Sequence, residues 1–186
     1  SVLMVKPTAA IRPNTPIRLT GIVTSGMIGE PNWEAAFVAL LRGAERKSAS
    51  ALAQLNVLDV AGLTSVRGLQ DFANAPRPRM VSEAPHIATL DGLLPRAICD
   101  HWIARTRPKL SAARVHDAEQ GGRRVDAMRT NTGAGFRLSD TDLIMQMTRS
   151  RIASAIGQPL GNQEPANVLH YAVGQSYEPH YDFLDP

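Results

Sequence analysis

Apolar residues recur at helical spacing in two stretches of the first half of the chain. The first follows Asn32, a favourable N-cap residue, and its apolar positions are Trp33, Ala36, Phe37, Leu40, Leu41 and Ala44. After a polar break at residues 46–48, the second stripe consists of Ala51, Leu52, Leu55 and Leu58. This pattern predicts two alanine-rich helices joined by a tight turn, as in one tetratricopeptide-type unit or in an ordinary helical pair. Residues 1–31 contain four prolines and predict only one short strand, around residues 17–23.

A proline-rich stretch separates these helices from the rest of the chain. Residues 75–79 read Ala-Pro-Arg-Pro-Arg, and two prolines so close together exclude both a helix and a central strand. We therefore predict a linker at this point. It divides the chain into a helical N-terminal region, residues 1–75, and a second region, residues 76–186.

The first part of the second region mixes helical and strand-like patterns. Pro95 is a suitable first helical residue, and the helix that follows is predicted to end before Pro108 and to bury Ile98, Trp102 and Ile103. Cys99 lies within this helix, where we expect a buried and unreactive thiol. Over residues 112–138, strand-like pieces are interrupted by the glycines of segments 121–122 and 133–135.

The end of the chain predicts one long helix and two strands. Ser139-Asp140-Thr141-Asp142 has the pattern of a capping box, and the helix that it opens should stop at Gly157, before Pro159. Residues 167–173 and 177–183 are rich in β-branched and aromatic residues and predict two strands. Gly174-Gln175-Ser176 supplies the turn between them.

Composition places the chain among globular proteins. Of its 186 residues 44% are hydrophobic and 20% are charged, and there is a single cysteine, which excludes a disordered chain and a disulfide scaffold. No apolar run approaches the ~18 residues of a membrane helix, and residues 1–6 do not resemble a signal peptide, so we expect a cytoplasmic protein without a membrane partner. The net charge of +3 comes from scattered basic residues, which argues against nucleic-acid binding.

Candidate chemistry appears in the last predicted strand. His180 and Asp182 are two residues apart, so both side chains would project from one face of a strand. An imidazole and a carboxylate placed in this way supply two ligands of a 2-His-1-carboxylate site, which leaves open positions on Fe(II). By itself the spacing favours a solvated surface pair, because a histidine with an acid two residues later arises by chance in about four in ten such sequences.

The surrounding residues change this interpretation. The stretch Glu164–Phe183, EPANVLHYAVGQSYEPHYDF, resembles the prolyl 4-hydroxylase-like branch of the Fe(II)/2-oxoglutarate dioxygenases. In that family a strand ending in Tyr, a Gly-rich turn and a Y-x-P-H-x-D element follow one another. Residues 129–133, RTNTG, are similar to its R-T-S-x-G segment, while residues 149–153 and 94–99 are similar to two of its helices. The resemblance extends from about Met80 to Pro186.

The resemblance implies a fold, a reaction and a set of cofactors. The implied fold is α+β, with an N-terminal α-helical segment followed by the beginning of a double-stranded β-helix (jelly-roll) domain and its supporting helices. The implied reaction couples oxidative decarboxylation of 2-oxoglutarate to hydroxylation of a residue in a peptide or protein, with proline as the expected target. Fe(II) and the cosubstrate 2-oxoglutarate are implied as cofactors, O2 as second substrate, and ascorbate as a candidate further cofactor.

Five residues take roles by the same resemblance. His180 and Asp182 would be the first two iron ligands, and Tyr171 would hydrogen-bond 2-oxoglutarate. Tyr177 and Arg129 match positions that line the peptide groove. Taken as residues alone, these three admit structural roles as well: a core tyrosine at 171, and ordinary strand and loop residues at 177 and 129.

One family feature is missing after the H-x-D element. The family places a distal His ligand and a basic residue for 2-oxoglutarate well downstream, whereas only four residues follow Asp182 here. We therefore expect this chain to be the first part of a longer enzyme. The alternative is a non-catalytic helical interaction module that carries an incomplete or inactive jelly-roll.

Overall fold

The computed structural model of the chain describes residues 31–116, 123–125 and 127–180. Its helices are α2 (Trp33–Glu45), α3 (Ala49–Val60), α4 (Val66–Ala73), α5 (Arg96–Thr106) and α6 (Leu143–Ile156). Its strands are β1 (Arg79–Glu83), β2 (His86–Thr89), β3 (Ser111–Ala112), β4 (Val115–His116), β5 (Arg123–Arg124), β6 (Thr132–Gly135) and β7 (Asn167–His170). Short 3₁₀ turns are η1 (Arg107–Lys109), η2 (Leu138–Asp140) and η3 (Leu160–Asn162). The strand predicted around residues 17–23 lies outside the described residues.

Helices α2 and α3 confirm the predicted pair. Asn32 caps α2 by accepting a hydrogen bond from the amide of Ala35 at 2.9 Å, and Ser48 caps α3 in the same way. The two helices approach closely at Gly43, where an added Cβ would lie 3.0 Å from the Cβ of Ala51. A third helix, α4, follows after its N-cap Ser65, and the sequence patterns did not predict it.

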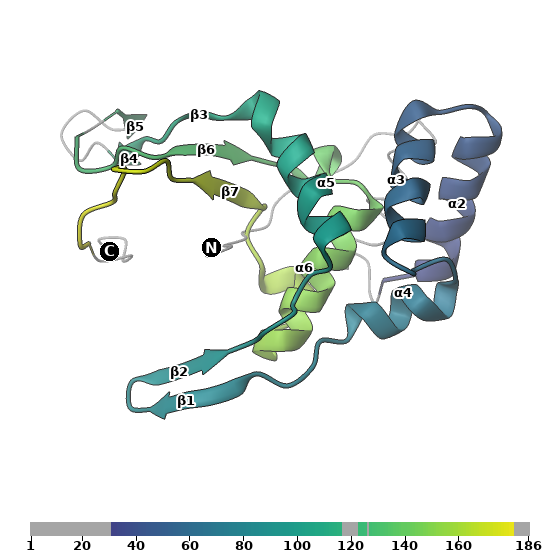
Figure 1. Ribbon diagram of the computed structural model, residues 1–186, viewed down its shortest axis with the longest axis horizontal. Helices are drawn as coiled ribbons and strands as arrows, with labels where there is room; N and C mark the ends of the chain where they lie inside the picture. Colours follow the sequence, from purple (N-terminus) through teal and green to yellow (C-terminus); the bar gives the residue numbers. More distant parts are fainter. Residues whose placement is uncertain (1–30, 117–122, 126, 181–186) are drawn as a thin grey trace.

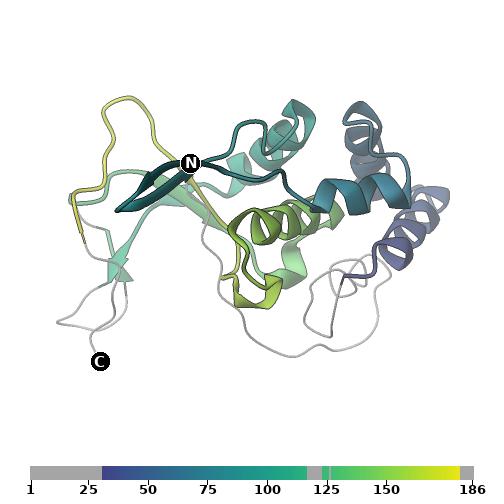
Figure 2. The same cartoon turned by 90° about the horizontal axis from the view of Figure 1, so that it is seen from below.

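One hydrophobic core runs through the described part of the molecule. Side chains of α2, α3 and α4 pack in the same buried cluster as side chains of α5, α6 and the segment around β6, including Trp33, Leu58, Phe72, Ile98, Trp102, Phe136, Leu143 and Met147. In Figures 1 and 2, helices α5 and α6 lie between the first three helices and the sheet. The N-terminal helices therefore bury their apolar faces against the rest of the chain.

The helix around Trp102 forms, with three changes from its prediction. Pro95 is the N-cap of α5 and not its first helical residue, and Ile103 is 50% exposed although it was predicted to be buried. Cys99 is half-buried rather than fully buried. The Trp102 ring packs edge-on against Phe136, with 5.7 Å between the ring centroids, and its indole N–H donates to Thr148 Oγ1 at 3.0 Å.

Helix α6 begins three residues later than the capping box predicted. Asp142 is the N-cap, and its Oδ1 accepts from the amide of Met145 at 3.0 Å, while Ser139 lies in the 3₁₀ turn η2. The predicted end is confirmed: Gly157 is the C-cap residue and adopts the left-handed conformation with φ 64°, which glycine reaches without steric cost.

Three short strands form the sheet next to these helices. Their order is β3-β6-β7, all antiparallel, with β6 in the centre. The glycines of residues 133–135 were expected to interrupt a strand, but they lie within β6. At Gly133 a Cβ would come within 3.2 Å of the Leu169 side chain, so the small residue permits close packing. Strand β7 ends at His170, three residues earlier than predicted.

Two further strand pairs complete the mixed helix-and-sheet fold. Strands β4 and β5 pair with each other, and β1 and β2 form an antiparallel hairpin that starts at Arg79, within the predicted linker. The hairpin and the three-stranded sheet extend from the same side of the helical body (Figures 1 and 2). Among the described residues, no helix combines the length and apolar character that crossing a membrane requires.

Candidate functional site

The candidate site is built on a pairing between two segments that lie 46 residues apart in the sequence. The amide of Thr130 donates to the carbonyl of Ser176 at 3.0 Å, and the amide of Glu178 donates to the carbonyl of Met128 at 3.0 Å. Between these hydrogen bonds, Arg129 and Tyr177 face each other as antiparallel bridge partners. Side chains of such a non-hydrogen-bonded pair lie especially close together, so this pairing places Arg129 against Tyr177.

A three-layer stack results from this pairing. The guanidinium carbon of Arg129 lies over the Tyr177 ring, 4.5 Å from its centroid. The His180 imidazole stacks on the same tyrosine, with 3.6 Å between centroids and 22° between the ring planes. Three of the five residues that the resemblance assigned to the site are therefore in contact.

The backbone after Tyr177 departs from the predicted strand. Tyr177 makes a single bridge, and residues 178–180 do not continue as a strand, because the backbone bends at Pro179. Pro179 has no N–H to donate to a ladder, which disfavours regular pairing at this point. The bend lets the His180 ring fold back over Tyr177, whereas residues three apart in a strand face opposite sides.

The tautomer of His180 follows from its contact with the backbone. Its Nδ1 lies 2.8 Å from the carbonyl oxygen of Glu178. A carbonyl can only accept, so Nδ1 carries the proton, and the lone pair of the neutral ring is then on Nε2. This is the form in which a histidine binds a metal through Nε2, with its other ring nitrogen held by a backbone carbonyl.

The other two predicted site residues are Tyr171 and Asp182. Tyr171 follows the end of β7, and its side chain is 42% exposed, so it is not a core tyrosine. Asp182 lies outside the described residues. Within the part of the chain that the structure describes, no group of three or more His, Cys, Asp and Glu side chains is placed to hold a metal ion.

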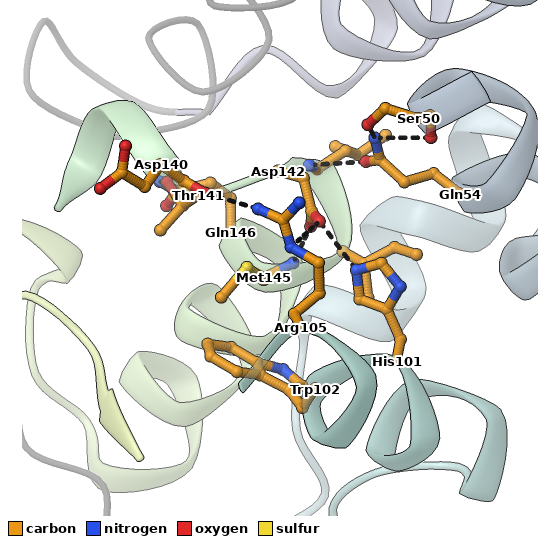
Figure 3. A network of polar contacts seen from close by, with 12 residues as sticks. Ser50, Gln54, His101, Trp102, Arg105, Asp140, Thr141, Asp142, Met145 and Gln146 are labelled. Carbon is orange, nitrogen blue, oxygen red and sulfur yellow. Dashed lines mark hydrogen bonds and ion pairs between the residues drawn. The ribbon is translucent and has the colours of Figure 1, made fainter. Parts of the chain in front are cut away.

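A second polar cluster lies where α3, α5 and α6 meet (Figure 3). His101 Nε2 is 2.7 Å from Asp142 Oδ2, and both side chains are 9% exposed. Arg105 lies 3.6 Å from the same carboxylate oxygen and donates to the carbonyl of Asp140. From α3, Gln54 accepts from the amide of Leu143 at 3.0 Å. No sequence pattern predicted this cluster, because its residues come from three separate elements. Its hydrogen bonds close the first turn of α6, which indicates a structural role.

Helix α6 also buries an arginine. Arg149 is 3% exposed; its Nη1 donates to Gln146 Oε1 at 2.9 Å, and its Nε has no hydrogen-bond partner among the described residues. Burial lowers the pKa of Arg149 to about 10. Two residues on, burial also lowers the pKa of Arg151, whose guanidinium donates to the carbonyls of Phe72 and Leu93. Helix α6 is thus tied to α4 and to the loop before α5.

Comparison with known proteins identifies relatives among the prolyl 4-hydroxylases. No protein-family model matches the chain. Prolyl 4-hydroxylase 5 of Arabidopsis thaliana is 35% identical to it over 107 residues, which cover 57% of this chain and 36% of the relative. Probable prolyl 4-hydroxylases 7 and 3 of the same plant are each 32% identical, over 58% and 56% of this chain and over 34% and 36% of their own lengths. The chain spans about a third of the length of these curated relatives.

Proposed function

We propose that this chain, which carries a prolyl 4-hydroxylase-like region, belongs to an Fe(II)- and 2-oxoglutarate-dependent dioxygenase that hydroxylates proline in a peptide or protein. The observation that carries the proposal is the stack of Arg129, Tyr177 and His180. These residues come from two distant segments, and each was assigned to the site from its motif alone. Their contact is expected if both motifs serve one site.

Each residue takes a distinct role in this proposal. His180 and Asp182 hold the metal, Tyr171 donates its phenol O–H to 2-oxoglutarate, and Arg129 and Tyr177 line the groove for the peptide. Tyr171 is exposed at the end of β7, so its hydroxyl is accessible to a small dicarboxylate. Tyr177 is half-buried, and its two ring faces are in contact with Arg129 and His180. Its hydroxyl edge is therefore the part that would contact a peptide.

The chemistry of the donor set fits ferrous iron. A neutral imidazole with its lone pair on Nε2 and a carboxylate are the ligand types of non-haem Fe(II) oxygenases. When bound, the metal supplies the oxidant for attack on an unactivated C–H bond, together with 2-oxoglutarate and O2. The protein's part is to orient the cosubstrate and the peptide and to limit the access of water.

We further propose that the short sheet β3-β6-β7, with α5 and α6, is the beginning of a double-stranded β-helix. Residues 1–75 would then support this domain rather than present a separate binding surface. The support for this role is that the buried faces of α2, α3 and α4 belong to the core that continues into α5 and α6. A free interaction module would keep such a face for its partner.

The test is succinate release by the full-length protein with Fe(II), 2-oxoglutarate and a proline-containing peptide. We expect turnover that requires both cofactors and that falls to the level of the enzyme-free control in His180→Ala and Asp182→Ala. His86→Ala, which removes an exposed histidine of β2, is the matched control and should retain wild-type turnover. Succinate release that survives both ligand substitutions would show that the metal site lies elsewhere.

A further inference from the structure

The ring of Tyr177 is enclosed on both sides, and this has a consequence for the proposed metal site. The Arg129 guanidinium carbon and the His180 ring lie 4.5 Å and 3.6 Å from the tyrosine centroid. Non-bonded carbon atoms need about 3.5 Å between them, so two planar groups this close to one ring centre cannot share a face. They occupy opposite faces, and no substrate group can stack on this tyrosine.

We propose that Tyr177 is a positioning residue, whose ring orients the imidazole of His180 for metal binding. The inference rests on the proposed function, because it takes His180 as a ligand. Two contacts fix the imidazole: the near-parallel stack on Tyr177 restricts its rotation, and the hydrogen bond from Nδ1 to Glu178 fixes its tautomer. Neither contact alone fixes both the plane of the ring and the identity of the ligating nitrogen.

The tyrosine is itself held from its other side. Arg129 Nε donates to Asn131 Oδ1 at 2.9 Å, and Asn131 is 1% exposed. The backbone hydrogen bonds that flank Arg129 and Tyr177 lock the two residues opposite each other. A platform anchored to a buried residue in this way suits the orientation of an exposed imidazole.

The experiment measures metal binding without turnover. Co²⁺ is titrated into the full-length, metal-free protein and is followed by its visible absorption, for wild type, Tyr177→Phe, Tyr177→Leu and His180→Ala. Tyr177→Phe keeps the ring and loses only the hydroxyl, so its Co²⁺ affinity should stay within about threefold of wild type. Tyr177→Leu removes the platform and should weaken binding by about 10- to 100-fold, the range measured for residues that orient metal ligands.

A second measurement distinguishes a loss of ring orientation from misfolding of the variant. In the metal-free protein, the nitrogen chemical shifts of the His180 ring report its tautomer. The Nδ1–H form should dominate in wild type and in Tyr177→Phe. In Tyr177→Leu the imidazole loses the stack that holds its plane, rotates away from the Glu178 carbonyl, and should therefore show a mixture of tautomers. A Tyr177→Leu protein whose other amide signals match wild type is folded, and its ring signals then decide the question.

The outcomes separate this inference from the proposed function. If His180→Ala binds Co²⁺ as wild type does, the proposed metal site is wrong. If His180→Ala loses binding while Tyr177→Leu retains wild-type affinity and tautomer, the proposed function stands and the positioning role is overturned. If Tyr177→Phe and Tyr177→Leu weaken Co²⁺ binding equally, the effect belongs to the tyrosine hydroxyl, and the proposal that the ring positions His180 is likewise overturned.

Discussion

Gln54 links the N-terminal helices to the start of α6, and its replacement tests whether both halves of the chain share one core. Its side chain is 3% exposed, and its Oε1 accepts from the amide of Leu143, one of the N–H groups that the first turn of α6 leaves without a partner inside the helix. Its Nε2 donates to the carbonyl of Ser50 within α3. A side chain of α3 therefore caps the first turn of α6, although the two residues lie 89 positions apart in the sequence.

Gln54→Met removes the acceptor while nearly keeping the side-chain volume. The amide of Leu143 then stays buried without a partner, and such a group costs about 1–3 kcal/mol of the free energy of unfolding. A cavity adds little, because methionine fills the same space. The matched control is Asn56→Met on the exposed face of α3, which should change stability by no more than about 0.5 kcal/mol.

The assay is hydrogen exchange of the full-length protein at increasing urea concentration, read by mass spectrometry on separate peptides. Peptides from α2–α3 and from α6 should lose the same free energy of opening in Gln54→Met, because one hydrophobic cluster contains both. Destabilisation confined to the α2–α3 peptides would show that residues 1–75 unfold independently. An unchanged α6 peptide would refute the argument that Gln54 caps that helix.

Two more predictions concern α6. Gly157→Ala should lower the free energy of unfolding by about 1 kcal/mol in urea titrations because of the positive φ, whereas Gly161→Ala, which meets no neighbouring atom, should be close to neutral. The second concerns pH. Burial lowers the pKa of Arg149 to about 10, so at pH values between that pKa and the higher pKa of an ordinary arginine the unfolded chain binds more protons than the folded one. The stability of wild type should therefore rise relative to Arg149→Met by about 1 kcal/mol per unit above pH 10, with a constant difference below about pH 9. A difference that stays flat through pH 11 would contradict the burial argument.

Local chemistry was enough to predict helices whose start depends on one capping residue. Asn32 and the apolar stripe after it predicted α2, and Gly157 predicted the end of α6. The start of α6 was misplaced because Ser139 and Asp142 both satisfy the local capping preference. Two contacts favour Asp142 as the N-cap. His101 of α5 contacts its second carboxylate oxygen, and Gln54 of α3 accepts a hydrogen bond from the amide of the next residue, Leu143. Such contacts between distant elements leave no mark in a short window of sequence.

Strands were harder to predict because their pairing is non-local. The glycines of β6 were expected to interrupt a strand. Instead, the absence of a side chain at Gly133 makes room for the side chain of Leu169 on the neighbouring strand β7. Hairpin β1–β2 is exposed along nearly its whole length, so it has no buried face that an alternating pattern could reveal. The linker prediction at residues 75–79 therefore missed the strand that begins at Arg79.

The candidate site shows where motif and periodicity disagree. Period-two alternation predicted a strand through His180, with its side chain beside that of Asp182 on one face. The described backbone bends at Pro179 instead, and the His180 ring turns back onto Tyr177. The motifs nevertheless selected residues that meet. Arg129 and Tyr177 are bridge partners in a pairing whose next residues, Thr130 and Ser176, are 46 positions apart, and no local pattern contains such a contact. The orientation of the His180 side chain therefore depends on the stacked Tyr177 ring and not on strand alternation. For that reason, substitutions at Tyr177 test the site more directly than changes in the spacing between His180 and Asp182 would.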